Sequence, residues 1–157
     1  MGVSGCGKTS VARALAERCG GSYVDADDFH PESNKQKMAA GIPLTDEDRW
    51  PWLNVLGGEL AKGATTGRPF FLACSALKQS YRDRLSKGLP ELRFVYLKGS
   101  LELIRERMSQ RQDHFMPLAL LESQFAALEE PVNALVLDIA KPLEVMVEDF
   151  FAEVRME

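Results

Sequence analysis

The chain opens with a glycine-rich segment whose residue types suit the binding of a phosphate chain. Residues 2–9 match the pattern GxxxxGK[ST], and a helical period follows at once. Glycines let successive backbone N–H groups turn toward one anion, and the helix start adds the positive end of its dipole. The expected phosphate-binding residues are Gly2, Val3, Ser4, Gly5, Cys6, Gly7, Lys8 and Thr9. Lys8 would reach the outer phosphates and the Thr9 hydroxyl would bind Mg²⁺, whereas an accidental match in a flexible terminus is the alternative.

An acidic segment supplies candidate catalytic carboxylates. Asp25 and Asp27 follow a short apolar strand, and His30 and Pro31 come directly after them. Ligands of open parallel sheets bind outside the carboxyl ends of the strands. Carboxylates there can order metal-bound water and accept the proton of an attacking hydroxyl. An acidic turn that begins a helix is the alternative, but the nearby phosphate-binding pattern favours the catalytic interpretation.

Two groups of basic residues are suited to anions. Lys78 and Arg82 lie four residues apart, so they share one helix face just beyond a strand, where they could bind an anionic small substrate. Arg107 and Arg111 have the same spacing on a later helix and could close over phosphates. For both pairs the alternative is a charged face that only contacts solvent.

Strands and helices alternate along the chain, which predicts an α/β fold with a parallel sheet covered by helices on both faces. We expect one domain over residues 1–157. The apolar patterns predict strands at 22–24, 70–74, 94–97 and 135–139, and helices at 8–19, 31–40, 78–86, 101–111, 118–128 and 142–154. Thr45 and Asp48 form a capping-box pattern that begins a further helix.

Composition narrows the class of protein. The 157 residues are 45% apolar and carry a net charge of −4, which argues against a surface that binds nucleic acid or anionic lipid. No apolar run reaches the ~18 residues of a membrane span. The three cysteines form no CxxC pair, which favours a reducing compartment, and no secretory signal opens the chain. We therefore expect a cytoplasmic protein.

The strand that normally precedes a phosphate-binding loop of this kind is missing, because only Met1 stands before Gly2. A strand of ~5 buried apolar side chains contributes about 10 kcal/mol. This is comparable to the ~5–15 kcal/mol that stabilises a whole domain. We expect the true start to lie upstream; the alternative is a shortened form that folds poorly or with a substitute strand.

The ordered motifs resemble the gluconokinases of the thermoresistant type, a family of small P-loop sugar-acid kinases. The resemblance rests on residues 2–9, 25–53, 73–83, 96–99, 114–115 and 123–131. It implies a parallel sheet of the nucleoside-monophosphate-kinase type, often in a homodimer. It also implies ATP-dependent phosphorylation of D-gluconate at its 6-hydroxyl to 6-phospho-D-gluconate, which feeds the pentose phosphate pathway.

The resemblance and the loose transition state of phosphoryl transfer together suggest roles for individual residues. Lys8 would act on the phosphates, Asp27 would accept or orient the sugar hydroxyl, and Asp25 would organise the water bound to the metal. The expected gluconate ligands are Arg49, Lys78, Arg82 and, with less support, His30. Arg107 and Arg111 would cover ATP. Two alternatives stay open: another small P-loop kinase, such as one acting on shikimate, and an N-terminally truncated, non-catalytic isoform.

Overall fold

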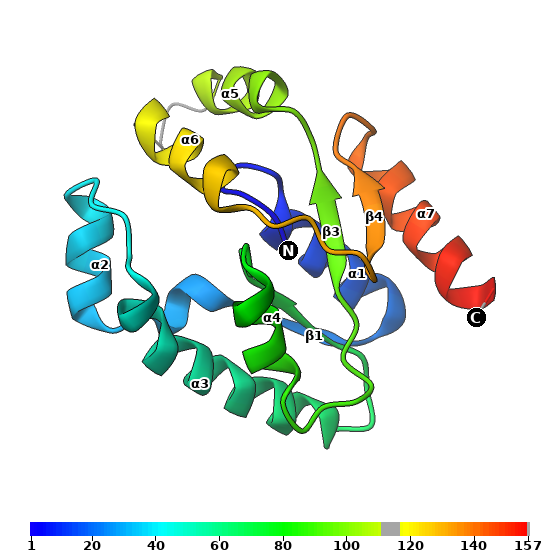
Figure 1. Ribbon diagram of the computed structural model, residues 1–157. Coiled ribbons are helices and arrows are strands. Elements are labelled where there is room, and N and C mark those ends of the chain that lie inside the picture. The colour runs from blue at the N-terminus through cyan, green and yellow to red at the C-terminus, as the bar shows by residue number, and fades with distance from the viewer. Residues whose placement is uncertain (111–116, 157) are drawn as a thin grey trace.

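The computed structural model describes residues 1–110 and 117–156 as helices packed around short parallel strands (Figure 1). The predicted alternation of strands and helices is confirmed, with element ends that differ from the expected ones by at most two residues. The helices are α1 (Lys8–Cys19), η1 (Ala26–Phe29, a 3₁₀ turn), α2 (Glu32–Ala39), α3 (Asp46–Ala64), α4 (Gln79–Ser86), α5 (Leu101–Ser109), α6 (Leu118–Ala127) and α7 (Leu143–Met156). The strands are β1 (Ser22–Asp25), β2 (Phe70–Ala73), β3 (Val95–Lys98) and β4 (Leu135–Asp138).

The two helices nearest the predicted site begin as their sequences indicate. Helix α1 starts after Gly7 (φ 95°) and ends at Gly20 (φ 67°), two left-handed positions that favour glycine. Helix α3 starts at the capping box of Thr45 and Asp48, in which each side chain accepts a hydrogen bond from the backbone N–H of the other residue. Pro51 lies early enough in α3 to cost little of its hydrogen bonding.

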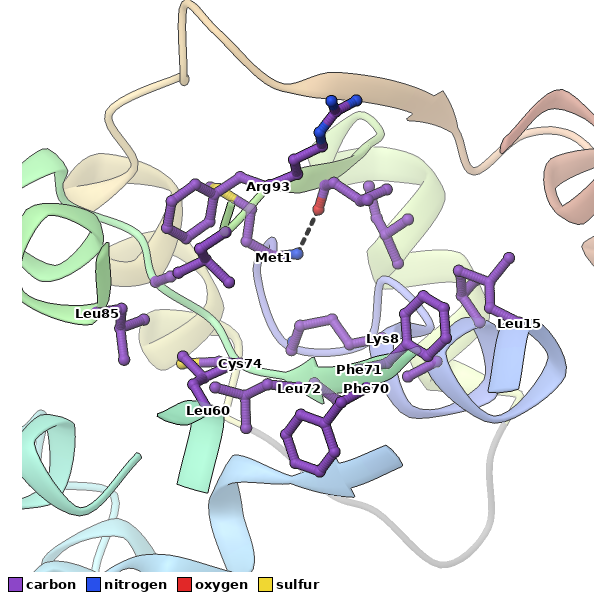
Figure 2. Close-up of a pocket in the computed structure, with 18 residues that line it drawn as sticks. Met1, Lys8, Leu15, Leu60, Phe70, Phe71, Leu72, Cys74, Leu85 and Arg93 are labelled. Atoms are coloured by element: carbon purple, nitrogen blue, oxygen red, sulfur yellow. Dashed lines mark hydrogen bonds between the residues drawn. The ribbon is translucent and has the colours of Figure 1, made fainter. Parts of the chain in front are cut away.

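The strands are parallel, as predicted, but they form two pairs rather than one continuous sheet. In the pair β1–β2, Tyr23 lies opposite Phe71; in the pair β3–β4, Tyr96 lies opposite Val136. No ladder joins β2 to β3 within residues 1–110 and 117–156. Met1 bonds to Val95 (Figure 2) and Leu97 of β3, and Gly2 donates to the carbonyl of Ser75 just beyond β2.

Helices cover the strands on both faces, as expected. Helix α1 packs on β1, β2 and α7, while α3 packs on β2 and α4. Two apolar clusters result, one around Leu15, Ile104 and Leu137 and the other around Leu53 and Leu56. Among the described helices, none is both long and apolar enough to cross a membrane. The two clusters fix the ends of β1, β2 and β3, where the candidate site lies.

Candidate active site

The glycine-rich loop forms a hollow of backbone groups at the start of α1. Gly5 and Gly7 have φ values of 79° and 95°, in the left-handed region. A Cβ atom at Gly5 would come within 2.9 Å of Met108 in α5, so only glycine fits there. At Gly7 no atom lies within 4 Å of such a Cβ, so the hollow is open on this side. This geometry fits the predicted phosphate-binding function of the loop.

One side chain from α6 and one from the loop itself hold the loop in shape. Gln124 of α6 accepts a hydrogen bond from the Ser4 backbone N–H (2.7 Å), and its amide group donates to the Ser4 hydroxyl (3.1 Å). The Lys8 ammonium donates to the carbonyl of Val3 (2.9 Å). Val3 and Cys6 are buried in the apolar cluster around Leu15 and Ile104 and so anchor the loop to the core. Gln124 lies in segment 123–131 of the family resemblance, but its type and spacing alone predict no role.

The loop is joined to strand β1 through Thr9 and Asp25. The Thr9 hydroxyl donates to Oδ2 of Asp25 (2.5 Å), and Oδ1 of Asp25 accepts the backbone N–H of Asp27 (3.0 Å). Residues 1–110 and 117–156 contain no group of three or more metal-binding side chains. Mg²⁺ commonly takes one or two protein oxygens and completes its shell with phosphate oxygens and water. The hydroxyl and carboxylate oxygens of Thr9 and Asp25 fit this requirement.

Asp27 lies at the start of η1 with an exposed carboxylate. Partial desolvation by the surrounding protein raises its pKa, and so does the negative charge of Asp25. The positive charges of Lys8 and Arg49 act in the opposite direction. A carboxylate with a raised pKa is a better proton acceptor than a free one. Asp27 therefore lies within electrostatic range of both the loop lysine and a second cationic region.

His30 is buried beside Asp27 and is not exposed at the surface of the site. Its ring stacks on Trp52 with centroids 4.1 Å apart, and its Nδ1 lies 3.3 Å from the Asn34 amide nitrogen. Its Nε2 lies 3.8 Å from the Asp27 carboxylate. Burial, followed by the charge of Arg49, lowers the pKa of His30 to about 4, so the ring is neutral at pH 7. Its buried position is better suited to orienting Asp27 than to direct contact with a large substrate.

The second cationic region gathers around Tyr81. Lys78 donates to Asp46 (2.9 Å), and the Tyr81 hydroxyl donates to the same carboxylate. The Arg49 guanidinium lies 5.5 Å above the Tyr81 ring, and its buried Nε has no hydrogen-bond partner among the described residues. A buried N–H without a partner costs free energy, which a ligand acceptor would recover. Lys78 and Arg49 are thus brought together, as predicted, whereas Asp46 and Tyr81 were identified only as part of the resemblance.

Arg82 differs from the expectation. Its side chain is buried, with 2% of the residue exposed, and it donates to the carbonyls of Ala76, Leu77 and Glu129. It also donates to the side chain of Gln79. The spacing of four residues from Lys78 indicated one shared face, but Lys78 precedes the first residue of α4 and its ammonium bonds to Asp46 of α3 instead. We therefore correct the assignment of Arg82 from a substrate ligand to a residue that fixes the loop before α4.

Of the two arginines expected to cover ATP, only Arg107 lies among the described residues. Arg107, in the last turn of α5, donates to the carbonyl of Ile139 just after β4 (2.5 Å). This contact places it beside the loop between β4 and α7. Arg111 lies outside the described residues.

Comparison with known proteins identifies the family. Residues 1–131 match the AAA domain family. The thermosensitive gluconokinase of Escherichia coli (strain K12) is 50% identical over 134 residues, which cover 83% of this chain and 70% of that protein. The thermoresistant gluconokinase of the same organism is 43% identical over 148 residues, covering 92% and 85%.

A solved structure agrees with the sequence relatives. The crystal structure of a gluconokinase from Sinorhizobium meliloti 1021 has a TM-score of 0.88 and is 47% identical, with 97% of this chain and 87% of that chain covered. The family resemblance and the P-loop kinase fold predicted from the sequence are thereby confirmed. These matches agree with the open glycine loop and its neighbouring carboxylates, and they show that the chain belongs to the gluconokinase family.

Proposed function

We propose that this protein is a gluconokinase, which transfers the γ-phosphoryl group of ATP to the 6-hydroxyl of D-gluconate. The alternative acceptors considered from the sequence, shikimate among them, have no observation in their favour. The relatives that match across most of the chain are gluconokinases. We further propose that residues 1–157 act as one kinase domain, in the cytoplasm, and as a homodimer.

One observation supports this proposal above the others: Asp27 lies within electrostatic range of both cationic groups that the reaction requires. Lys8 of the loop and Arg49 of the pocket both act on the Asp27 charge. A phosphate donor held by the loop and a sugar acid held by the pocket would therefore meet at this carboxylate. The Arg49 Nε–H has no hydrogen-bond partner among residues 1–110 and 117–156, and it would donate to the substrate carboxylate.

The chain's own residues would divide the work as follows. The loop amides and Lys8 bind the phosphates, while Arg49 and Lys78 bind the carboxylate and hydroxyls of gluconate. Asp27 receives the proton of the 6-hydroxyl as that oxygen bonds to the γ-phosphorus and the bond to the β,γ-bridging oxygen breaks. Thr9 and Asp25 would hold Mg²⁺ and its water. When bound, this ion neutralises charge on the phosphates.

A coupled assay of ADP release tests the proposal. The protein is supplied with ATP, Mg²⁺ and, in parallel, D-gluconate, shikimate or D-glucose, and the product is identified by mass spectrometry. We expect 6-phosphogluconate and turnover with gluconate at least 100-fold above the other acceptors, on the order of the discrimination that charged contacts provide. Binding of ATP without turnover on any acceptor would instead support a non-catalytic form.

A further inference from the structure

Asn34 of α2 carries a buried amide group that the mechanism above does not use. Only 2% of the residue is exposed, whereas its chain neighbours Ser33 and Lys35 lie at the surface. Buried polar side chains are hydrogen-bonded, because an unpaired one costs free energy. The partners of the Asn34 side chain therefore indicate what it does.

The nitrogen of the Asn34 amide has two partners. It donates to the backbone carbonyl of Asp48 in the first turn of α3 (2.9 Å), and it lies 3.3 Å from Nδ1 of His30. A carbonyl oxygen only accepts hydrogen bonds, so an amide turned the other way would bring two acceptors together. The Asp48 carbonyl thereby fixes which way the Asn34 amide faces.

Other bonds hold the Asp48 carbonyl in place. The Asp48 side chain accepts from the Lys37 ammonium (2.8 Å) and from the backbone N–H of Thr45 (2.9 Å). Asn34 and Lys37 lie one turn apart, so both attach the same face of α2 to the first turn of α3. The next residue in that turn is Arg49, the proposed gluconate ligand. Asn34 is therefore anchored beside the sugar-acid pocket.

The Asn34 amide also determines the tautomer of His30. Burial lowers the pKa of His30 to about 4, so the ring is neutral at pH 7 and carries a single N–H. Because the Asn34 nitrogen is a donor, Nδ1 of His30 must be the acceptor, which leaves the hydrogen on Nε2. The opposite tautomer would bring two N–H groups together inside the protein.

Stacking fixes the orientation of the His30 ring. The ring lies against Trp52 with centroids 4.1 Å apart and planes inclined by 13°. Trp52 is itself held, since its Nε1 donates to the carbonyl of Ala26 in η1 (2.8 Å). A half-turn of the His30 ring within this plane of contact would place a carbon beside Asn34 and carry Nε2 away from Asp27. One ring orientation therefore satisfies all of these neighbours.

The N–H on Nε2 lies beside the candidate proton acceptor. Nε2 is 3.8 Å from Oδ1 of Asp27, which is longer than a hydrogen bond, so the ring acts on the carboxylate through the positive end of its N–H dipole. In the other tautomer a lone pair would face this negative charge. The Asp27 side chain is 81% exposed, so a fixed, buried neighbour is what can hold one of its oxygens.

We propose that Asn34 is a positioning residue of the kinase reaction, which keeps the hydrogen of His30 on Nε2. The ring then holds Oδ1 of Asp27, while Oδ2 receives the proton of the gluconate 6-hydroxyl. The contacts run from the Asp48 carbonyl through Asn34 and His30 to Asp27. This assignment rests on the proposed function, in which Asp27 is the proton acceptor.

Nuclear magnetic resonance of the ring nitrogens reads the tautomer without any substrate. The chain has two histidines, so the His30 signals are those missing from the spectrum of His30→Gln. In ¹⁵N-labelled protein at pH 7 we expect a hydrogen on Nε2 and none on Nδ1. Asn34→Asp places an oxygen against Nδ1, so Nδ1 should become protonated. Gln36→Glu makes the same change at an exposed position of α2 and should leave the tautomer unaltered.

Rates show whether the tautomer matters to the reaction. Asn34→Asp should lower kcat about 10-fold, the effect of one lost polar contact, and should change both KM values less than about threefold. Gln36→Glu should keep the kcat of the unmodified protein. In a His30→Gln background, Asn34→Asp should lower kcat by less than about threefold more, because Asn34 acts through the ring. A purely structural role would give the same fold decrease in both backgrounds.

Circular dichroism checks that the variants fold, and the spectrum of the unmodified protein does not depend on them. A hydrogen on Nδ1 of His30 in the unmodified protein, or equal effects of Asn34→Asp in the two backgrounds, would overturn the role of Asn34. If the hydrogen lies on Nε2 but the unmodified protein does not phosphorylate gluconate, the proposed function is overturned instead, and the catalytic part of this inference with it.

Discussion

The hydroxyl of Thr9 donates a hydrogen bond of 2.5 Å to the carboxylate of Asp25, and this contact joins the first turn of α1 to the end of β1. The same carboxylate caps η1 through the backbone N–H of Asp27. A single acidic side chain therefore sets the position of the phosphate-binding loop relative to the candidate proton acceptor. Removal of the Thr9 hydroxyl or of the Asp25 carboxylate should affect metal binding and the placement of Asp27 together.

The first prediction concerns the metal. Thr9→Ala removes the hydroxyl oxygen proposed to bind Mg²⁺, so half-maximal activity should require roughly 10- to 100-fold more Mg²⁺. Thr9→Ser keeps the hydroxyl oxygen, so the Mg²⁺ concentration for half-maximal activity should stay within about threefold of that of the unmodified protein. The measurement is the initial rate against the concentration of Mg²⁺ at constant ATP. Equal Mg²⁺ requirements for the two variants would remove Thr9 from the metal site.

The second prediction concerns proton transfer. Asp27→Asn should lower kcat by about 10²- to 10⁴-fold with little change in the KM for ATP, because the amide cannot accept the proton. Since the pKa of Asp27 is raised above its usual value, kcat of the unmodified protein should begin to fall at a pH above 3.8 as the solution becomes more acidic. Asp28→Asn is the matched control, since Asp28 is an exposed neighbour, and it should retain full activity.

Most of the helices and strands could be predicted from periodicity. The spacing of Leu53, Leu56 and Leu60, for example, predicts a helix without any knowledge of the rest of the fold. The phosphate-binding loop could also be predicted from the sequence, because its backbone conformation depends on glycines that lie close together in the chain. The assignment of Arg82 could not be settled in this way. Spacing on a helix says which residues share a face but not whether that face meets solvent or the carbonyls of a buried loop.

The division of the four strands into two separate pairs also could not be predicted from local sequence patterns. Each strand is apolar and short, and nothing in residues 70–74 or 94–97 indicates which edge goes unpaired. Pairing of parallel strands depends on contacts distant in sequence, here the bonds of Met1 and Gly2 to Val95, Leu97 and Ser75. The Nε of Arg49, which has no hydrogen-bond partner in the described part of the chain, likewise depends on tertiary packing.

The third prediction separates Arg82 from the substrate pocket. Arg82→Ala leaves the carbonyls of Ala76 and Leu77 without their donor in a buried setting. The free energy of unfolding should fall by about 3 kcal/mol, which lowers Tm by roughly 6–12 °C for a chain of this size. Differential scanning calorimetry measures the change. A normal Tm combined with a raised KM for gluconate alone would restore Arg82 to the substrate site.

The fourth prediction concerns the sugar acid. Arg49→Ala should raise the KM for gluconate about 10- to 100-fold, because a charged hydrogen bond to the substrate carboxylate is lost, and should change the KM for ATP less than threefold. Arg13→Ala removes an exposed arginine from α1 and serves as the control, with both constants unchanged. Equal increases of both KM values in Arg49→Ala would show that the residue acts on the whole site rather than on gluconate.

The last prediction concerns the dependence of stability on pH. The pKa of His30 is lowered from 6.5 to about 4 in the folded protein, chiefly by burial. Between these values the unfolded chain binds a proton that the folded protein does not, so stability falls as the pH decreases from 6.5 to about 4. This residue alone should remove roughly 3 kcal/mol over that interval. Urea unfolding at closely spaced pH values measures the change.

His30→Gln isolates the contribution, since it lacks the titrating ring but keeps every carboxylate and the Met1 amino group. Its stability should change less than that of the unmodified protein between pH 6.5 and 4, by the roughly 3 kcal/mol assigned to His30. Above pH 7 the two should differ only by a constant, which reflects the lost stacking on Trp52. Parallel curves of stability against pH for the two proteins would mean that His30 titrates alike in the folded and unfolded states. Its ring would then be hydrated rather than buried against Trp52.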